Sequence, residues 1–231
     1  MSHYIQFGSR KIDFQLVYSD RKSLGISVNP ELLVLVKAPA GTTLEKVKEK
    51  IRKKAPWIIR QQSFFLSFHP KTPARRFVGG ETHLYLGRQY RLKILRSKTE
   101  SVKLNGQFIE VTTTKKENAK QLVNEWYLMN AKAKFHAIAK PLISKFKKHN
   151  VEPSSIILRE MPTRWGSCTA KGKIILNPEL IKAPKGCIEY VIIHELCHLI
   201  IRDHTQKFIE LQTKEMADWE KWKTKLEKLL A

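Results

Sequence analysis

The chain of 231 residues is long enough to bury the core of one or two domains without disulfide support. Its 43 Lys and Arg residues outnumber its 21 Asp and Glu residues, and the net charge of +22 gives a surface that attracts polyanions such as nucleic acid. Its three cysteines form no C-x-x-C pair, and no apolar run approaches a membrane span, which argues against a disulfide scaffold and a membrane protein.

The first part of the chain, residues 1–115, is rich in strand signals. Runs of β-branched or alternating apolar residues predict strands at 11–19 and 32–39. After a loop at 71–81, further strands are predicted at 82–87, 89–96, 101–104 and 107–113, with Asn105-Gly106 as a hairpin turn.

A helix is inserted between these two groups of strands. Thr42 and Glu45 are spaced as a capping box, and the apolar residues that follow recur at helical spacing. Pro56 is expected to kink or end this helix, so that a second helical piece covers residues 57–68.

The second part, residues 116–231, is mainly helical. A helical pattern at 116–148 is interrupted by Pro141. Strands are then predicted at 154–168 and 171–180, an apolar helix at 183–201, and one long amphipathic helix at 204–230. The chain is thus predicted to have an α+β fold with a β-rich N-terminal part, a helical middle and a compact C-terminal α+β unit.

The stretch HELCHLIIRDH places several metal-ligand residue types close together. At about 100° per residue, His194 and His198 share one helix face a turn apart, and Glu195 flanks that face. Two imidazoles with an adjacent carboxylate suit metal-assisted hydrolysis, in which the ion lowers the pKa of a water molecule and the carboxylate takes its proton. H-E-x-x-H on a helix is therefore typical of zinc metalloproteases, and one Zn²⁺ ion is the expected cofactor.

A catalytic metal usually needs a third protein ligand, and His204 is the favoured one. A continuing helix would carry His204 about 9 Å beyond His198, so the chain must turn back near residues 201–203. Ile201 disfavours left-handed backbone geometry, whereas Asp203 tolerates it and could make the turn. The alternative third ligands are carboxylates of the last helix, namely Glu215, Asp218 and Glu220.

Several motifs in this part follow one another at a characteristic spacing. RWGSC (164–168), IILNPEL (174–180), IEYVIIHELCHL (188–199) and His204 with Phe208 together resemble the YgjP-like metallopeptidase family, related to the SprT-like and WLM proteases. The resemblance implies a zincin-like C-terminal unit with an HExxH active-site helix. It also implies that His194, His198 and His204 bind the metal and that Glu195 is the general base.

By analogy with zincin-type proteases, an edge strand at Thr163–Cys168 or Lys173–Asn177 would pair with an extended substrate. Arg159 or Arg164 could stabilise an oxyanion, although a surface or interstrand role is the simpler interpretation. Cys197 is expected to be a small buried hydrophobic residue.

The sequence thus predicts a cytoplasmic zinc metallopeptidase that acts on a protein or peptide substrate without a membrane partner. Its opening segment lacks the apolar core of a signal peptide. One alternative is a nucleic-acid-associated SprT-like protease, suggested by the positive charge. Another is a metal-stabilised binding protein without turnover. Neither the cleavage specificity nor the oligomeric state follows from the sequence.

Overall fold

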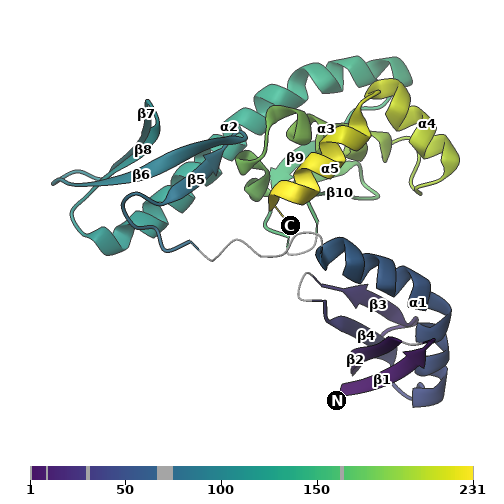
Figure 1. The fold of residues 1–231 in the computed structure, drawn as a ribbon. Helices are drawn as coiled ribbons and strands as arrows, with labels where there is room; N and C mark the ends of the chain where they lie inside the picture. Colours follow the sequence, from purple (N-terminus) through teal and green to yellow (C-terminus); the bar gives the residue numbers. More distant parts are fainter. Residues whose placement is uncertain (1, 9, 30–31, 67–74, 162–163, 231) are drawn as a thin grey trace. The chain divides into compact units, whose positions relative to one another are not determined.

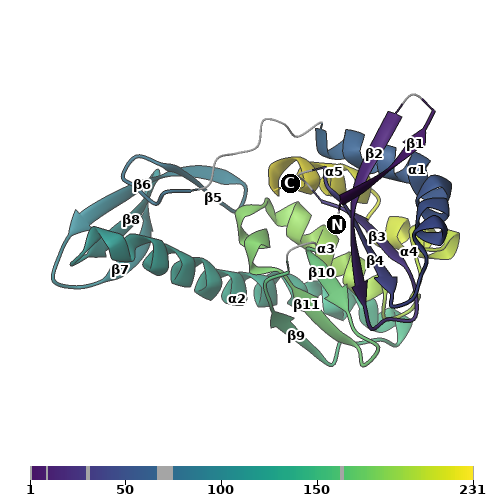
Figure 2. The ribbon, with the colours of Figure 1, turned by 90° about the horizontal axis from the view of Figure 1, so that it is seen from below.

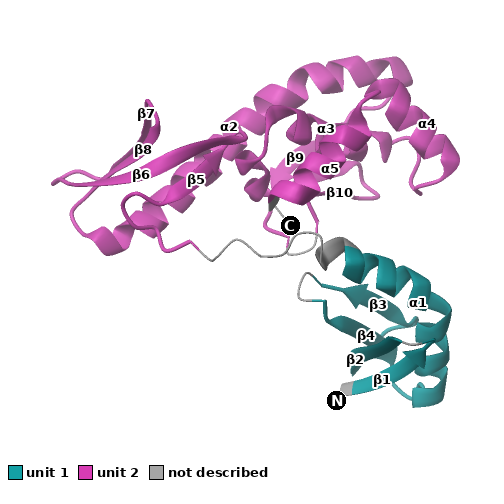
Figure 3. Ribbon diagram, in the orientation of Figure 1, with its two compact units in different colours: residues 1–73, 231 teal, residues 74–230 magenta. Residues whose placement is uncertain are grey.

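The computed structural model describes residues 2–8, 10–29, 32–66, 75–161 and 164–230. The chain forms two compact units, residues 1–73 and 74–230 (Figure 3). This division does not coincide with the domain boundary predicted between residues 115 and 116, which stays a prediction. Among the described residues, no helix combines the length and the apolar character needed to cross a membrane.

Unit 1 is a sheet covered on one face by a helix. The strands form one sheet in the order β1-β2-β4-β3, with β2 and β4 parallel and the outer pairs antiparallel. Along β2, buried Ile12, Phe14 and Leu16 alternate with exposed residues and form one core with Val47 and Ile51 of α1. The elements are β1 (Ser2–Phe7), β2 (Arg10–Ser19), β3 (Gly25–Val28), β4 (Val34–Pro39) and α1 (Leu44–Leu66).

Strands β1 and β3 complete this sheet, although the sequence pattern did not predict them. Of the loop predicted at 71–81 and the helical piece predicted at 57–68, residues 67–74 lie outside the described residues.

Two prolines lie inside helices and do not end them. Helix α1 runs through Pro56, and α2 (Ala119–Phe146) runs through Pro141. Both prolines occupy exposed positions, so the carbonyl that loses its N–H partner lies on the solvent side of the helix. The helix end that was one of the two effects expected at Pro56, and the interruption expected at Pro141, were therefore wrong, whereas the kink expected as the other effect of Pro56 stays a prediction.

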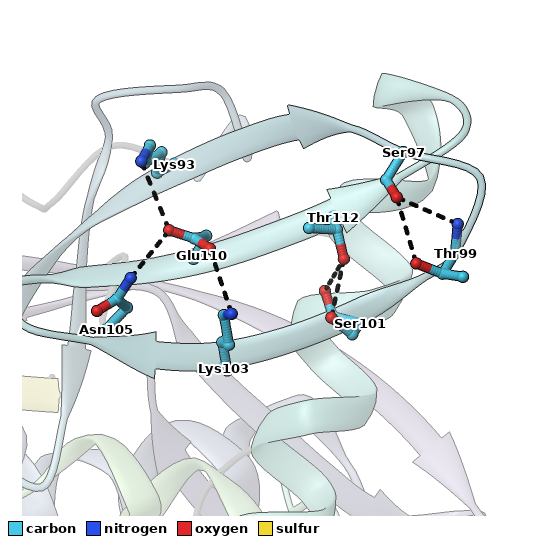
Figure 4. Close-up of polar contacts among 8 residues, drawn as sticks. All are labelled: Lys93, Ser97, Thr99, Ser101, Lys103, Asn105, Glu110 and Thr112. Atoms are coloured by element: carbon cyan, nitrogen blue, oxygen red, sulfur yellow. Dashed lines mark hydrogen bonds and ion pairs between the residues drawn. The ribbon is translucent and has the colours of Figure 1, made fainter.

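Unit 2 begins with a second sheet, whose four strands the sequence predicts. One face of this sheet contributes Ile109 and Val111 to the core shared with α2. On the other face, the Glu110 carboxylate lies between Lys93 Nζ at 3.5 Å and Lys103 Nζ at 3.6 Å (Figure 4). The sheet order is β5-β6-β8-β7, formed by β5 (Thr82–Tyr85), β6 (Arg88–Arg96), β7 (Ser101–Asn105) and β8 (Phe108–Thr113).

The long helix α2 connects this sheet to the rest of unit 2. The β5–β8 sheet lies at one end of α2, and helices α3, α4 and α5 gather toward the other end (Figures 1 and 2). A three-stranded sheet in the order β10-β11-β9 packs beside α3. The elements are β9 (Ser155–Leu158), β10 (Gly166–Cys168), β11 (Lys173–Leu176), α3 (Lys185–Cys197), α4 (Gln206–Glu215) and α5 (Trp219–Leu230).

The C-terminal helix predicted at 204–230 is two helices in the structure. Helix α4 ends where the backbone of Met216 becomes extended, with φ −150° and ψ 93°, and α5 begins at Trp219. The break lets the apolar sides of both helices pack on one core, to which Phe208 and Leu226 contribute buried side chains. A single straight helix would have carried α5 away from that core.

Glu215, at the end of α4, is a buried carboxylate held by three basic groups. Its fully buried side chain lies 3.2 Å from Lys145 Nζ, 2.8 Å from Lys148 Nζ and 2.9 Å from His149 Nε2. Burial acts to raise the pKa of Glu215, but the hydrogen bonds from these groups outweigh it and lower the pKa to about 2. The carboxylate therefore ties α4 to the C-terminal end of α2 and the turn that follows.

Replacing Glu215 by glutamine should lower the free energy of unfolding by about 1–3 kcal/mol at pH 7, because the buried side chain loses its charge-assisted hydrogen bonds. The folded-state pKa lies below the ordinary value of 4.5, so this stabilisation is present above about pH 4.5 and lost as the pH falls towards 2. Urea unfolding at pH 7 and pH 3 measures both effects.

The exposed Glu152, which pairs with Lys147 at 3.6 Å, provides the control. Glu152→Gln should change the free energy of unfolding by less than about 0.5 kcal/mol. If the free energies of unfolding of wild type and Glu215→Gln differed by the same amount at pH 7 and pH 3, the lowered pKa assigned to Glu215 would be contradicted.

Candidate metal centre

Helix α3 places His194 and Glu195 in its last turn, with His198 as the C-cap residue. The helix follows Pro184, and its core side includes Ile188, Ile192 and Leu196, each 0 % exposed. Because this side is anchored in the core, the opposite side presents the histidines to a cleft.

The chain leaves α3 earlier than the sequence predicts. The last turn tightens, with the N–H groups of Ile200 and Ile201 both donating to the Cys197 carbonyl, at 3.0 and 2.9 Å. The described residues with a positive φ include neither Ile201 nor Asp203. The chain therefore returns towards His204 without a left-handed residue. The left-handed backbone expected at Asp203 was wrong.

The turn brings three imidazole rings together. The Nε2 atom of His194 lies 3.2 Å from Nε2 of His198 and 3.0 Å from Nε2 of His204. One ligand atom from each of the three residues lies within 4.8 Å of the other two. The ring of Phe208 packs against all three imidazoles, with centroid distances of 5.0, 4.6 and 4.8 Å.

Hydrogen bonds on the far side of two rings determine which nitrogen is free. His198 Nδ1 lies 3.2 Å from the carbonyl oxygen of Ile201, which can only accept, so Nδ1 carries the proton and Nε2 a lone pair. His194 Nδ1 lies 2.7 Å from Oε1 of Gln212, also an acceptor. The two Nε2 lone pairs thus face each other at 3.2 Å and repel unless a cation lies between them.

These distances fit a zinc ion. Nitrogens bound to tetrahedral zinc at about 2.0–2.1 Å would lie about 3.3 Å apart. Burial lowers the pKa of His194 to about 4 and also lowers the pKa of His198, in both cases against the effect of their hydrogen bonds. Both rings are therefore neutral near pH 7, which is the form that binds a metal.

Two of the three carboxylates that the sequence offers as alternative third ligands, Glu215 and Asp218, make contacts elsewhere. Glu215 contacts Lys145 at the end of α2 and two basic groups of the turn that follows. Asp218 Oδ2 accepts a hydrogen bond from Trp222 Nε1 at 2.7 Å. Among the described residues, neither these two nor Glu220 joins His194 and His198 in a group that could hold a metal, whereas His204 does.

Glu195 lies beside the histidines in a cleft of about 780 Å³. Its side chain is largely buried, with the residue only 4 % exposed. Burial raises the pKa of Glu195 to about 7, although the charge of Arg164 and a hydrogen bond from the backbone N–H of Cys168 act in the opposite direction. The carboxylate is thus held between α3 and β10, at the wall of the cleft that holds the imidazoles.

Gly166 in β10 is the residue that allows this close approach. A Cβ atom at position 166 would lie 2.5 Å from Glu195 Oε1, 2.8 Å from Val191 Cγ1 and 2.9 Å from Glu195 Cγ. The backbone at Gly166 has no positive φ. Glycine is therefore needed here because a side chain would clash with Glu195 and Val191, and not because of the backbone conformation. The sequence pattern places Gly166 in a packed strand-to-turn element but does not show that it contacts Glu195.

Strand β10 is an edge of its sheet, while β11 pairs on both sides, so the structure distinguishes the two strands proposed as the edge. The N–H of Thr169 donates to the carbonyl of Lys173 at 2.9 Å. By antiparallel alternation, the backbone groups of Gly166 and Cys168 point away from β11, to the side that lines the cleft. Thr163, part of the predicted strand, lies outside the described residues.

Other residues singled out in the sequence take different positions. Arg164 is exposed and lines the cleft, whereas Arg159 is exposed and does not line it. Cys197 is 0 % exposed in the core, as expected.

Gln212, which the sequence pattern missed, is 1 % exposed and contacts His194. Its signal in the sequence is weak, namely a polar residue four positions after Phe208 on the apolar side of α4.

The comparison with protein families bears on the whole chain. The model of the family described as "YgjP-like, metallopeptidase domain" matches residues 22–229. The chain therefore belongs to the YgjP-like metallopeptidase family. Searches among curated proteins and among solved structures give no match.

The variant Gly166→Ala should lower the free energy of unfolding by about 1–3 kcal/mol, because the new methyl group must displace Glu195 and Val191. Chemical unfolding measures the change. Ser167→Ala on the same strand serves as the control and should have a much smaller effect. Equal free energies of unfolding for Gly166→Ala and wild type would show that β10 does not approach Glu195 too closely to admit a methyl group.

Proposed function

We propose that this protein is a zinc-dependent peptidase that hydrolyses peptide bonds, with His194, His198 and His204 as metal ligands and Glu195 as general base. The observation that carries the proposal is the cluster of three imidazole nitrogens, in which His194 Nε2 lies 3.2 Å from His198 Nε2 and 3.0 Å from His204 Nε2. Membership of a metallopeptidase family supports the same reaction class.

The donor set favours zinc. Neutral imidazoles suit zinc better than magnesium or calcium, which prefer oxygen ligands. Three protein ligands with an open position are typical of catalytic zinc sites, whereas structural sites usually close with a fourth protein ligand. When bound, the ion supplies Lewis acidity, which polarises a carbonyl group and lowers the pKa of a water molecule towards about 7.

Glu195 would act as the proton carrier. Its carboxylate lines the same cleft as the three imidazoles, and burial against β10 limits its movement. From this position it would accept a proton from the attacking water and pass it to the leaving amine nitrogen. Arg164, which is exposed and lines the cleft, would attract the carbonyl oxygen of a substrate.

An extended polypeptide is the substrate that the cleft wall suits. The outward backbone groups of Gly166 in the edge strand β10 could pair with a peptide lying along the cleft. The alternative of a binding protein without turnover leaves Glu195 unexplained, because a structural metal site needs no buried carboxylate in the cleft beside it.

A nucleic-acid-associated protease is the second candidate, favoured by helix α1. This helix carries seven basic and two acidic residues, and Lys46, Lys50 and Lys54 are among its exposed positions. Its opposite side is buried in the core of unit 1, so the charge lies on the solvent side. Such a surface suits a phosphate backbone.

The variant Glu195→Gln should retain one zinc ion per chain but lose at least about 100-fold in peptide hydrolysis, because the amide cannot accept the proton. His204→Ala should lose both the metal and the activity. Elemental analysis and a peptide-library cleavage assay measure these outcomes. Unchanged turnover in Glu195→Gln would remove Glu195 from the mechanism, and full zinc content in His204→Ala would remove His204 from the ligand set.

If α1 binds nucleic acid, the triple variant Lys46→Gln, Lys50→Gln and Lys54→Gln should bind duplex DNA more weakly. The slope of log K against log salt concentration should fall by the equivalent of about two to three phosphate contacts. The matched control replaces Lys120, Lys132 and Lys134, exposed residues of α2, and removes the same charge. Fluorescence anisotropy at several salt concentrations measures both. Equal losses in the two triple variants would mean that binding follows net charge and not α1.

A further inference from the structure

Gln212 stands out because it is a buried polar residue that the proposed mechanism does not use. It is 1 % exposed on α4, and its Oε1 atom lies 2.7 Å from Nδ1 of His194. This is the shortest of the polar contacts made by the three histidines. A buried amide at this distance is worth more than a surface contact, because no water can replace it.

The contact decides the tautomer of His194. A neutral imidazole carries one proton, and an acceptor at Nδ1 keeps that proton there, which leaves the lone pair on Nε2. The Nε2 atom is the one that faces His198 and His204. In the other tautomer, a proton on Nε2 would point into the cluster, and His194 could not serve as a ligand.

Helix α4 is well placed to hold this amide still. Phe208, one turn before Gln212, is 0 % exposed and packs under all three imidazole rings. Glu215, one turn after it, is fixed by Lys145 at the end of α2 and by Lys148 in the turn that follows. The amide therefore lies between two anchored residues on the buried side of one helix.

We propose that Gln212 is a positioning residue of the metal centre, which holds His194 in the Nδ1–H tautomer and thereby prepares its Nε2 atom for the metal. This inference rests on the proposed metal site but goes beyond it, because Gln212 would contact neither the metal nor the substrate. Acceptors in this position generally raise metal affinity by 10- to 100-fold.

The test compares zinc affinity in Gln212→Met and Gln212→Glu, measured by competition with a chelator at pH 7.5. Methionine has a similar volume but no strong acceptor, so affinity should fall about 10- to 100-fold. Glutamate restores an acceptor, so affinity should equal or exceed that of wild type. Gln206→Met, the same change at an exposed position of α4, is the matched control and should bind like wild type.

A second readout separates the tautomer from a general loss of structure. In metal-free protein, the ¹⁵N chemical shifts of the His194 ring report which nitrogen carries the proton. Wild type and Gln212→Glu should show the Nδ1–H form, and Gln212→Met should show a mixture or the Nε2–H form. Thermal unfolding checks that each variant is folded, and if Gln212→Met is not, Gln212→Leu replaces it.

The outcomes are distinguishable. If wild type binds no stoichiometric zinc, the proposed function fails. If wild type binds zinc and a folded Gln212→Met variant binds it equally well with an unchanged tautomer, only the role of Gln212 is overturned. A loss of affinity in Gln212→Glu as large as in Gln212→Met would also overturn it, because the acceptor would then not be what matters.

Discussion

The close approach of two imidazole nitrogens, Nε2 of His194 and Nε2 of His198 at 3.2 Å, is the constraint on which the rest of the site depends. Neutral rings repel in this arrangement, so the surrounding structure must hold them together until a cation offsets the repulsion. Three elements do so: α3 presents His194 and His198, the turn after it returns His204, and α4 supports the rings from behind. In a site of this kind the ligands are already in position, so less free energy is lost in ordering them when the metal binds.

Strand β10 forms part of the wall of the cleft that the histidines also line. Because Gly166 has no side chain, β10 can approach α3 closely enough to bury the Glu195 carboxylate. The same strand is an edge of its sheet and lines the cleft. One close contact between a strand and a helix thus brings the proposed base, the proposed metal and an open strand edge together. This combination, and not the fold class, supports a hydrolase that acts on extended peptides.

Local sequence signals predicted the parts of the structure that depend on local geometry. The spacing of His194 and His198 predicted that they share a face, because both lie at the C-terminal end of α3. The four strands of the β5–β8 sheet were predicted from alternating apolar residues and a hairpin-turn signal. The continuation of α1 through Pro56 and the break at Met216 depended on tertiary packing, which no local pattern reports. Gln212 was missed for the same reason, since its partner lies 18 residues away.

X-ray absorption at the zinc edge of the metal-loaded protein tests the central claim most directly. The account predicts a first shell of nitrogen and oxygen at about 2.0–2.1 Å, with the outer-shell scattering of three imidazole rings. That scattering should fall to two rings when His204 is replaced by alanine. A sulfur shell near about 2.3 Å, or fewer than three imidazoles in wild type, would contradict the account.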